Sequence, residues 1–220
     1  QVRGILRVNE LDQNEAKQIE RLRAEPQAQF ARLYSEFKER LKRIIHFRLD
    51  YRVAGRVSDS DILQECFVRA SKRLEKFLEK PDYPFFVWLR MQANQQVADI
   101  HRKHLMAEKR DARKEINLNA KQQGSNQTSM QLAAHLVAQM TSPSRLLQRS
   151  EEIAALESSL NEMNETDREV IALRHFEELS SQETAQVLGI EPAAASKRYV
   201  RALKRLQEIM SRHGFSREES

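Results

Sequence analysis

The sequence is poor in residues that break helices or cross-link chains. Its 220 residues include one cysteine, five glycines and five prolines, and aromatic residues make up 6%. The single cysteine, Cys66, excludes an intrachain disulfide framework and indicates a reducing compartment. No apolar run reaches the roughly 18 residues that span a bilayer, and no signal-peptide pattern opens the sequence. We therefore expect a soluble, cytoplasmic protein with no membrane partner.

Patterns that indicate catalysis or a bound cofactor are also missing. The sequence has no Gly-rich phosphate loop and no Ser/His/Asp arrangement. His101 and His104 lie three residues apart on a predicted helix, but two ligands are too few for a zinc site. Cys66 falls on an apolar stripe, which favours a buried small residue over a nucleophile. We expect no enzyme activity, no metal and no cofactor.

The residues that are abundant favour helices and a polyanionic partner. Charged residues make up 31% of the chain, and Leu, Ala, Glu, Arg and Gln are common, which predicts an all-α fold. The net charge is +5 and the isoelectric point is about 9.4. The distribution of charge indicates the place of a polyanionic partner better than the net charge does. Residues 151–191 are strongly acidic, and the segment that follows is basic.

The stretch 179–206 predicts two helices separated by a tight turn. Ser180 and Glu183 form a Ser-x-x-Glu capping box at the start of the first helix. Gly189 suits the left-handed residue that ends a helix, and Pro192 suits the first turn of the next one. A small residue at 185, a glycine four later and an apolar residue six after that form the helix-turn-helix pattern, which allows the two helices to approach closely.

The second helix of this pair is basic. Its charged residues are Lys197, Arg198, Arg201, Lys204 and Arg205. Such a helix suits DNA binding, and the alternative is an ordinary helical hairpin with a solvated basic face. Upstream, Thr166 with Glu169 predicts a second capping box.

Three amphipathic helices are expected in the N-terminal half, over about 27–49, 61–78 and 84–103. Ser58 is expected to cap the second of them. The third has an apolar side and an opposite polar side that contains no carboxylate and carries Arg90, Asn94, Gln95, His101 and Arg102. This polar side suits phosphates and base edges, and the alternative is a solvated helix face.

Together these patterns predict an all-α protein with two helical domains and a polar linker, the C-terminal domain being a helix-turn-helix of the winged-helix type without a wing. We expect an N-terminal extension at 1–26, a first domain at 27–105, a linker at 106–144, a second domain at 145–213 and a tail at 214–220. A short helix is possible at 130–140 within the linker.

Four motifs in order resemble the extracytoplasmic-function (ECF) group of RNA polymerase sigma factors. They are AQFARLYSEF at 28–37, DILQECFVRASKRLEKF at 61–77, PFFVWLRMQANQQVADIHRK at 84–103 and LNEMNETDREVIALRHFEELSSQETAQVLGI at 160–190, followed by RAL at 201–203. The resemblance covers about 27–212 apart from the linker. It implies a sigma factor that binds core RNA polymerase and directs promoter-specific initiation.

The resemblance also implies partners and sites in the first domain. The 61–77 helix would dock on the clamp helices of the polymerase largest subunit, with contacts from Asp61, Gln64, Glu65 and Arg69. The 84–103 helix and the loop 79–83 would hold the melted −10 strand, with contacts from Tyr83, Arg90, Asn94, Gln95, Asp99 and Arg102. Some members of the family are controlled by an anti-sigma factor, so such a partner is a further possibility.

The second domain would bind the double-stranded −35 element in its major groove. The contacts implied by the resemblance are Ser196, Lys197, Arg198, Arg201 and Lys204. Two departures from the family pattern put an ordinary promoter motif in doubt. Gln95 stands at the usual asparagine position, with Asn94 one place earlier, and residues 193–198 are Ala-Ala-Ala-Ser-Lys-Arg instead of Gly-Thr-Val-Lys-Ser-Arg.

Two other functions are compatible with the residues. A regulator that binds DNA alone as a dimer would use the first domain for dimerisation, and would need a palindromic site and a self-complementary apolar patch. A helical nucleic-acid enzyme is disfavoured because the sequence has no catalytic cluster.

Overall fold

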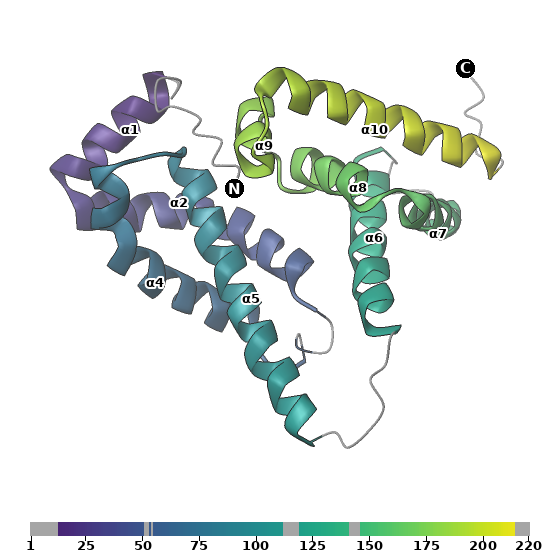
Figure 1. The fold of residues 1–220 in the computed structure, drawn as a ribbon, viewed down its shortest axis with the longest axis horizontal. Coiled ribbons are helices and arrows are strands. Elements are labelled where there is room, and N and C mark those ends of the chain that lie inside the picture. The colour runs from purple at the N-terminus through teal and green to yellow at the C-terminus, as the bar shows by residue number, and fades with distance from the viewer. Residues whose placement is uncertain (1–12, 51–52, 54, 112–118, 141–145, 214–220) are drawn as a thin grey trace. The chain divides into compact units, whose positions relative to one another are not determined.

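The computed structural model describes residues 13–50, 53, 55–111, 119–140 and 146–213, and every regular element in these ranges is a helix (Figure 1). The all-α prediction is therefore confirmed. Among the described helices, none combines the length and the apolar character that crossing a membrane requires. The chain divides into two compact units, residues 1–115 and 116–220.

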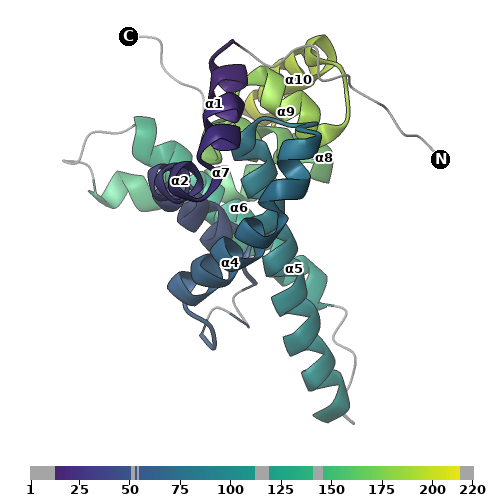
Figure 2. The same cartoon turned by 90° about the vertical axis from the view of Figure 1, so that its left-hand side faces the viewer.

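The first unit contains α1 (Gln13–Ala24), α2 (Pro26–Arg48), α4 (Asp59–Glu79) and α5 (Phe85–Asp111). Helices α2, α4 and α5 contact one another, and α1 packs on α2 and α4 (Figure 2). The predicted cap of α4 is confirmed, because Ser58 Oγ accepts a hydrogen bond from the Asp61 N–H at 3.1 Å. The three helices predicted from apolar spacing are present, and their ends lie within two residues of the expected ones except that α5 continues to Asp111, beyond the expected end at 103.

Aromatic side chains fill the centre of the first unit. Phe85 is 1% exposed and lies edge-on to Phe30, with ring centroids 6.2 Å apart. Trp88 stacks on Phe77, with ring centroids 4.5 Å apart, and is buried in this core. Cys66 is also buried as predicted, and burial raises the pKa of its thiol to about 11, so it is protonated at neutral pH.

The second unit contains α6 (Asn119–Met140), α7 (Leu146–Glu162), α8 (Glu165–Ile171), the π-helical turn η2 (Ala172–Phe176), α9 (Ser181–Leu188) and α10 (Pro192–Arg212). The predicted capping box at Thr166 is wrong. Asn164 caps α8 instead, because its Oδ1 accepts a hydrogen bond from the Asp167 N–H at 2.8 Å. Its Nδ2 also donates to Asp167 Oδ2 at 2.7 Å, and asparagine is a better cap than threonine.

Helix α6 differs from the expected polar linker at 106–144. It begins at Asn119, well before the short helix considered at 130–140, and it packs against α7 and η2. Its buried side chains are Ser129, Leu132, Ala133, Leu136 and Val137. The apolar residues of this set lie only in the last turns of a helix that is otherwise polar. The composition of the whole segment therefore does not reveal the helix. The segment is therefore part of the second unit's core.

We expect Leu132→Ala to lower the free energy of unfolding of the second unit by about 2–5 kcal/mol, because Leu132 is fully buried. Urea unfolding followed by far-UV circular dichroism reports on both units. Fluorescence of Trp88, the single tryptophan, reports on the first unit alone. The dichroism transition should shift while the fluorescence transition stays in place.

Met130→Ala is the matched control for this prediction, because Met130 lies on the same helix and is 47% exposed. It should leave both transitions close to those of the wild type. An equal shift of the two transitions in Leu132→Ala, or no shift, would contradict the packing of α6 within the second unit.

Candidate nucleic-acid interface

Helices α9 and α10 form the predicted helix-turn-helix, and local hydrogen bonds fix its turn. Ser180 Oγ accepts from the Glu183 N–H at 3.1 Å, and Glu183 Oε2 accepts from the Ser180 N–H at 2.7 Å, so the capping box is confirmed. Gly189 has φ 64° and ψ 35°, which is the left-handed conformation predicted for it. The N–H groups of Gly189 and Ile190 donate to the carbonyls of Gln186 and Ala185, as in a Schellman motif.

Small buried residues bring the two helices together. Ala185 of α9 is 0% exposed and Ala195 of α10 is 2% exposed. Pro192 opens α10 as predicted, because the first turn of a helix needs no N–H donor there. The inner side of α10 then continues with Ala202, Leu206 and Ile209, all buried. This stripe fixes which side of α10 faces solvent.

The outer side of α10 carries the residues predicted for −35 binding. Ser196, Lys197, Arg201 and Lys204 are exposed, and Arg198 is half-buried. No carboxylate occurs in the helix between Pro192 and Leu206, so the positive potential of this side has no local compensation. The exposed cations and the hydroxyl together make a surface, called here the α10 basic face, that is suited to phosphates and base edges.

Arg205, which the sequence groups with the other basic residues of this helix, has a different role. Its guanidinium donates a hydrogen bond to the carboxylate of Asp167 on α8, and Asp167 is 6% exposed. A buried carboxylate without this partner would be costly. Arg205 therefore holds α10 to α8. Asp167 lies on another helix, so the spacing of residues along α10 could not predict this ion pair.

Tyr199 anchors the middle of α10 through a second polar contact. Its hydroxyl lies 2.7 Å from Nε2 of His175 on η2, and the Arg174 guanidinium lies 5.4 Å from the Tyr199 ring centroid. Burial lowers the pKa of His175, and the nearby Arg174 and His135 lower it further, so the ring is neutral at pH 7. A neutral imidazole can accept the tyrosine proton in a hydrogen bond.

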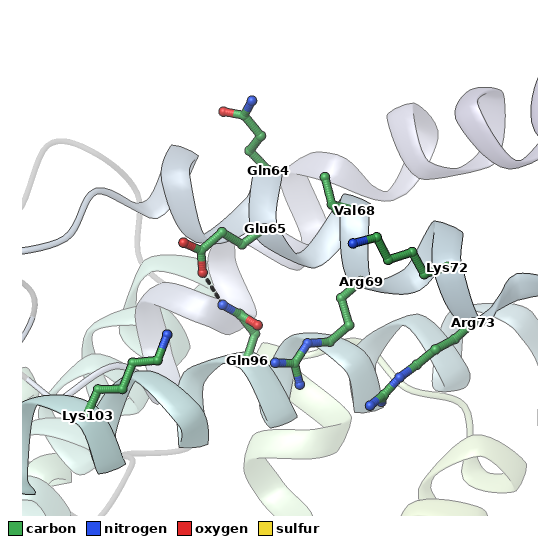
Figure 3. Close-up of a pocket in the computed structure, with 8 residues that line it drawn as sticks. All are labelled: Gln64, Glu65, Val68, Arg69, Lys72, Arg73, Gln96 and Lys103. Carbon is green, nitrogen blue, oxygen red and sulfur yellow. Dashed lines mark hydrogen bonds between the residues drawn. The ribbon is translucent and has the colours of Figure 1, made fainter.

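In the first unit, an open groove of about 640 Å³ runs between α4 and α5 (Figure 3). It brings together three of the residues predicted to bind polymerase, Gln64, Glu65 and Arg69. Val68, which is 45% exposed, supplies an apolar centre. The remaining lining residues are Lys72, Arg73, Gln96 and Lys103, so basic groups predominate. The fourth predicted residue, Asp61, is exposed at the start of α4.

A network of hydrogen bonds joins the two walls of this groove. Arg69 Nη2 donates to Asp99 Oδ2 at 2.5 Å, and Arg102 donates to the other carboxylate oxygen. Gln95 Nε2 also donates to Asp99 at 3.2 Å. These bonds, with that from Arg69 first, lower the pKa of Asp99 to about 2. Figure 3 shows the guanidinium of Arg69 directed from α4 towards α5 and Gln96 paired with Glu65.

The remaining residues predicted for −10 binding lie in different environments. Arg90 is 5% exposed, so its expected place on an exposed polar side is wrong; the first turns of α5 are buried on all sides between α2 and α4. Asn94 is half-buried, and its Oδ1 is buried without a hydrogen-bond partner among the described residues. Tyr83 is half-exposed in the loop before α5, and Gln95 and Arg102 are exposed.

The pair Arg69–Asp99 is the contact that the sequence did not reveal. Each residue stands out in its own motif, but nothing in either motif gives the register between two helices. The described residues contain no cluster of three potential metal ligands. His101 instead accepts a hydrogen bond from the Asp50 N–H at 2.9 Å, and the side chain of His104 lies outside the described residues.

The fold and these surfaces define a helix-turn-helix protein with a second helical unit. Residues 153–206 match the family described as sigma-70, region 4. The chain is 29% identical over 192 residues to the ECF RNA polymerase sigma factor BldN of Streptomyces coelicolor, covering 87% of this chain and 64% of BldN. It is 27% identical over 150 residues to the RNA polymerase sigma factor CnrH of Cupriavidus metallidurans, covering 68% of this chain and 72% of CnrH.

A solved structure of CnrH in complex with the cytosolic domain of CnrY is also similar, with 21% identity and a TM-score of 0.48 over 90% of this chain and 94% of that chain. Residues 153–206 thus match the sigma-70 region 4 family, and the chain as a whole is similar to ECF RNA polymerase sigma factors, the group that its motifs resemble.

The Asp99 network predicts a specific pH dependence. A carboxyl group whose pKa is lowered to about 2 from 3.8 stabilises the fold fully above about pH 5, and this contribution is lost as the pH falls towards 2. Asp99→Asn should therefore be less stable than the wild type at pH 7, and the difference should shrink as the pH falls from 5 to 3. Urea unfolding followed by Trp88 fluorescence measures both proteins.

An Arg69→Gln background provides the matched control, because Arg69 makes the largest contribution to the lowered pKa of Asp99. In that background, the pH dependence of the Asp99→Asn effect should be weaker. A stability difference between wild type and Asp99→Asn that stays constant from pH 7 to 3 would contradict the network.

Proposed function

We propose that this chain binds core RNA polymerase and directs it to promoters, where α10 contacts the −35 element and α5 contacts the −10 element. The observation that carries the proposal is the α10 basic face, which is exposed, free of carboxylates and held by a capped helix-turn-helix within the region 4 match. The similarity to BldN and CnrH, both RNA polymerase sigma factors, supports the choice of partner.

At the −35 element, the proposed contacts follow from exposure and chemistry. Arg198 and Arg201 offer guanidinium groups that can pair with guanine in the major groove, while Lys197 and Lys204 suit phosphates. Ser196 is exposed near the N-terminal end of α10, where a recognition helix commonly meets base edges. Arg205 is left out because it is bound to Asp167.

At the −10 element, the proposed contacts are Tyr83, Asn94, Gln95 and Arg102. Tyr83 can stack on an unpaired base, which contributes roughly 1–3 kcal/mol per base. The exposed amide of Gln95 suits a base edge, and Arg102 suits a phosphate. Asp99 organises Gln95 and Arg102 by accepting hydrogen bonds from both. Arg90 is left out of this set because it is buried.

For polymerase, the proposed surface is the exposed side of α4 with Asp61, Gln64, Glu65 and Arg69. The open groove beside it adds Val68 as an apolar contact surrounded by charges. An apolar centre with a polar rim is typical of protein–protein interfaces. An anti-sigma partner stays an expectation from the family resemblance.

In vitro transcription with purified core polymerase and a randomised promoter library tests the whole proposal. Addition of this chain should produce initiation from a recurrent pair of elements at a fixed spacing. Tight binding to a palindromic duplex in the absence of polymerase would instead support the dimeric regulator. Catalytic turnover of nucleic acid would support the enzyme alternative.

We expect Arg198→Ala to reduce binding by about 1–3 kcal/mol at one position of the −35 element and to relax the base preference there, because the lost contact is to a base edge. Selection from the promoter library with holoenzyme, which is core polymerase with this chain, measures the preference at every position. Arg212→Ala is the control, since Arg212 lies at the far end of α10 and pairs with Glu162. A uniform loss across all sequences would make Arg198 a phosphate contact.

We expect the double change Asp61→Asn and Gln64→Ala to weaken binding to core polymerase, because both side chains are exposed on the proposed docking side of α4. Competition with a labelled wild-type chain for core enzyme measures the affinity. Glu79→Gln, at the other end of the same helix, is the control. Unchanged competition by the double variant would argue against this side of α4 as the polymerase surface.

A further inference from the structure

The N-terminal helix α1 makes a specific polar contact with the end of α4. Nε and Nη2 of Arg23 both donate hydrogen bonds to the Leu78 carbonyl oxygen, at 3.2 and 2.8 Å. Ile19 and Leu22 on the same helix are 4% and 0% exposed, and α1 contacts both α2 and α4. Apolar packing therefore holds α1 in place, and the Arg23 guanidinium contacts a backbone carbonyl 55 residues away in sequence.

The carbonyl that Arg23 contacts has no helical donor of its own. Leu78 lies in the last turn of α4, where carbonyl groups lack intrahelical partners. The N–H of Asp82, four residues later, donates instead to the Lys80 carbonyl at 2.9 Å. Lys80, the C-cap, has φ −144° and ψ 85°, so no left-handed residue closes the helix. Arg23 supplies the missing donor, and its charge complements the helix dipole.

This contact stands at the start of the loop 80–84 that joins α4 to α5. Pro81 and Pro84 are buried and Tyr83 is half-exposed, so the loop is held at two points and presents one aromatic side chain. On the α5 side, the Trp88 N–H donates to the Pro84 carbonyl at 3.0 Å. On the α4 side, the Arg23 bonds fix the point at which the chain leaves the helix.

We propose that Arg23 is a positioning residue for the loop 80–84, and that α1 thereby takes part in holding the melted −10 strand. This inference rests on the proposed function, in which Tyr83 in this loop contacts an unpaired base. Arg23 itself does not touch the DNA. It fixes the loop in the conformation that presents Tyr83, so that the strand binds a surface formed beforehand.

The test uses holoenzyme assembled from core polymerase and the full chain. The probe is a fluorescent single-stranded oligonucleotide with the non-template sequence of the promoter recovered by the transcription selection. Fluorescence anisotropy gives the affinity of the holoenzyme for this oligonucleotide. The affinity of the chain for core polymerase and the affinity of the holoenzyme for a −35 duplex fragment are measured in parallel. The variants are Arg23→Gln, Arg23→Lys and Arg21→Gln. Arg21 is the matched control because it lies in the same last turn of α1 and is exposed.

Arg23→Gln should weaken binding of the single strand about tenfold, the scale of a lost hydrogen bond to a charged group. Its affinities for core polymerase and for the −35 duplex should not change. Arg23→Lys should recover part of the loss, because an ammonium group can still donate to the Leu78 carbonyl. Arg21→Gln should behave as the wild type.

Three results would overturn the inference. Wild-type affinity for the single strand in Arg23→Gln would remove the positioning role and leave the proposed function intact. An equal loss in all three measurements would give Arg23 a role in folding only. Failure of the wild-type holoenzyme to bind the single strand would refute the −10 part of the proposed function, and the inference with it.

Discussion

The carboxylate of Asp99 ties together the two helices on which the proposed polymerase and −10 surfaces lie. It accepts hydrogen bonds from Arg69 on α4 and from Arg102 on α5, and it keeps its negative charge because these donors lower its pKa. The proposed surfaces consequently share a residue pair. A partner that displaces Arg69 from Asp99 would also change the environment of Gln95 and Arg102, so binding at one proposed surface would affect the other.

The second unit uses a carboxylate in a related way. Asp167 on α8 forms an ion pair with Arg205. This arginine of the basic helix therefore serves the packing of α10 on α8. Together with the His175–Tyr199 hydrogen bond, this contact sets the rotation of α10 about its axis. The remaining cations then lie on one outer side. The α10 basic face is therefore defined as much by the charges that are bound inside the unit as by those that are exposed.

The elements that could be predicted from sequence are those determined locally. Apolar spacing gave α2 and α4, and the capping box with Gly189 gave the helix-turn-helix, because each depends on residues within a few positions of one another. Three features depend on distant neighbours and were missed. Arg90 is buried because α2 and α4 surround the start of α5, α6 packs its last turns on α7, and Arg69 meets Asp99 across two helices. A single sequence does not indicate which residues of one helix will lie opposite which residues of another.

The small size of the α10 basic face accounts for the proposal of two DNA contacts. Lys197, Arg198, Arg201 and Lys204 can neutralise only a few phosphates, so α10 alone is expected to bind DNA weakly at physiological salt. A second contact on the same complex raises the effective concentration of the first to the millimolar range. Each contact then needs only moderate affinity. In the proposed function, specificity would arise from the pair of elements and their spacing, which a small helix on its own could not provide.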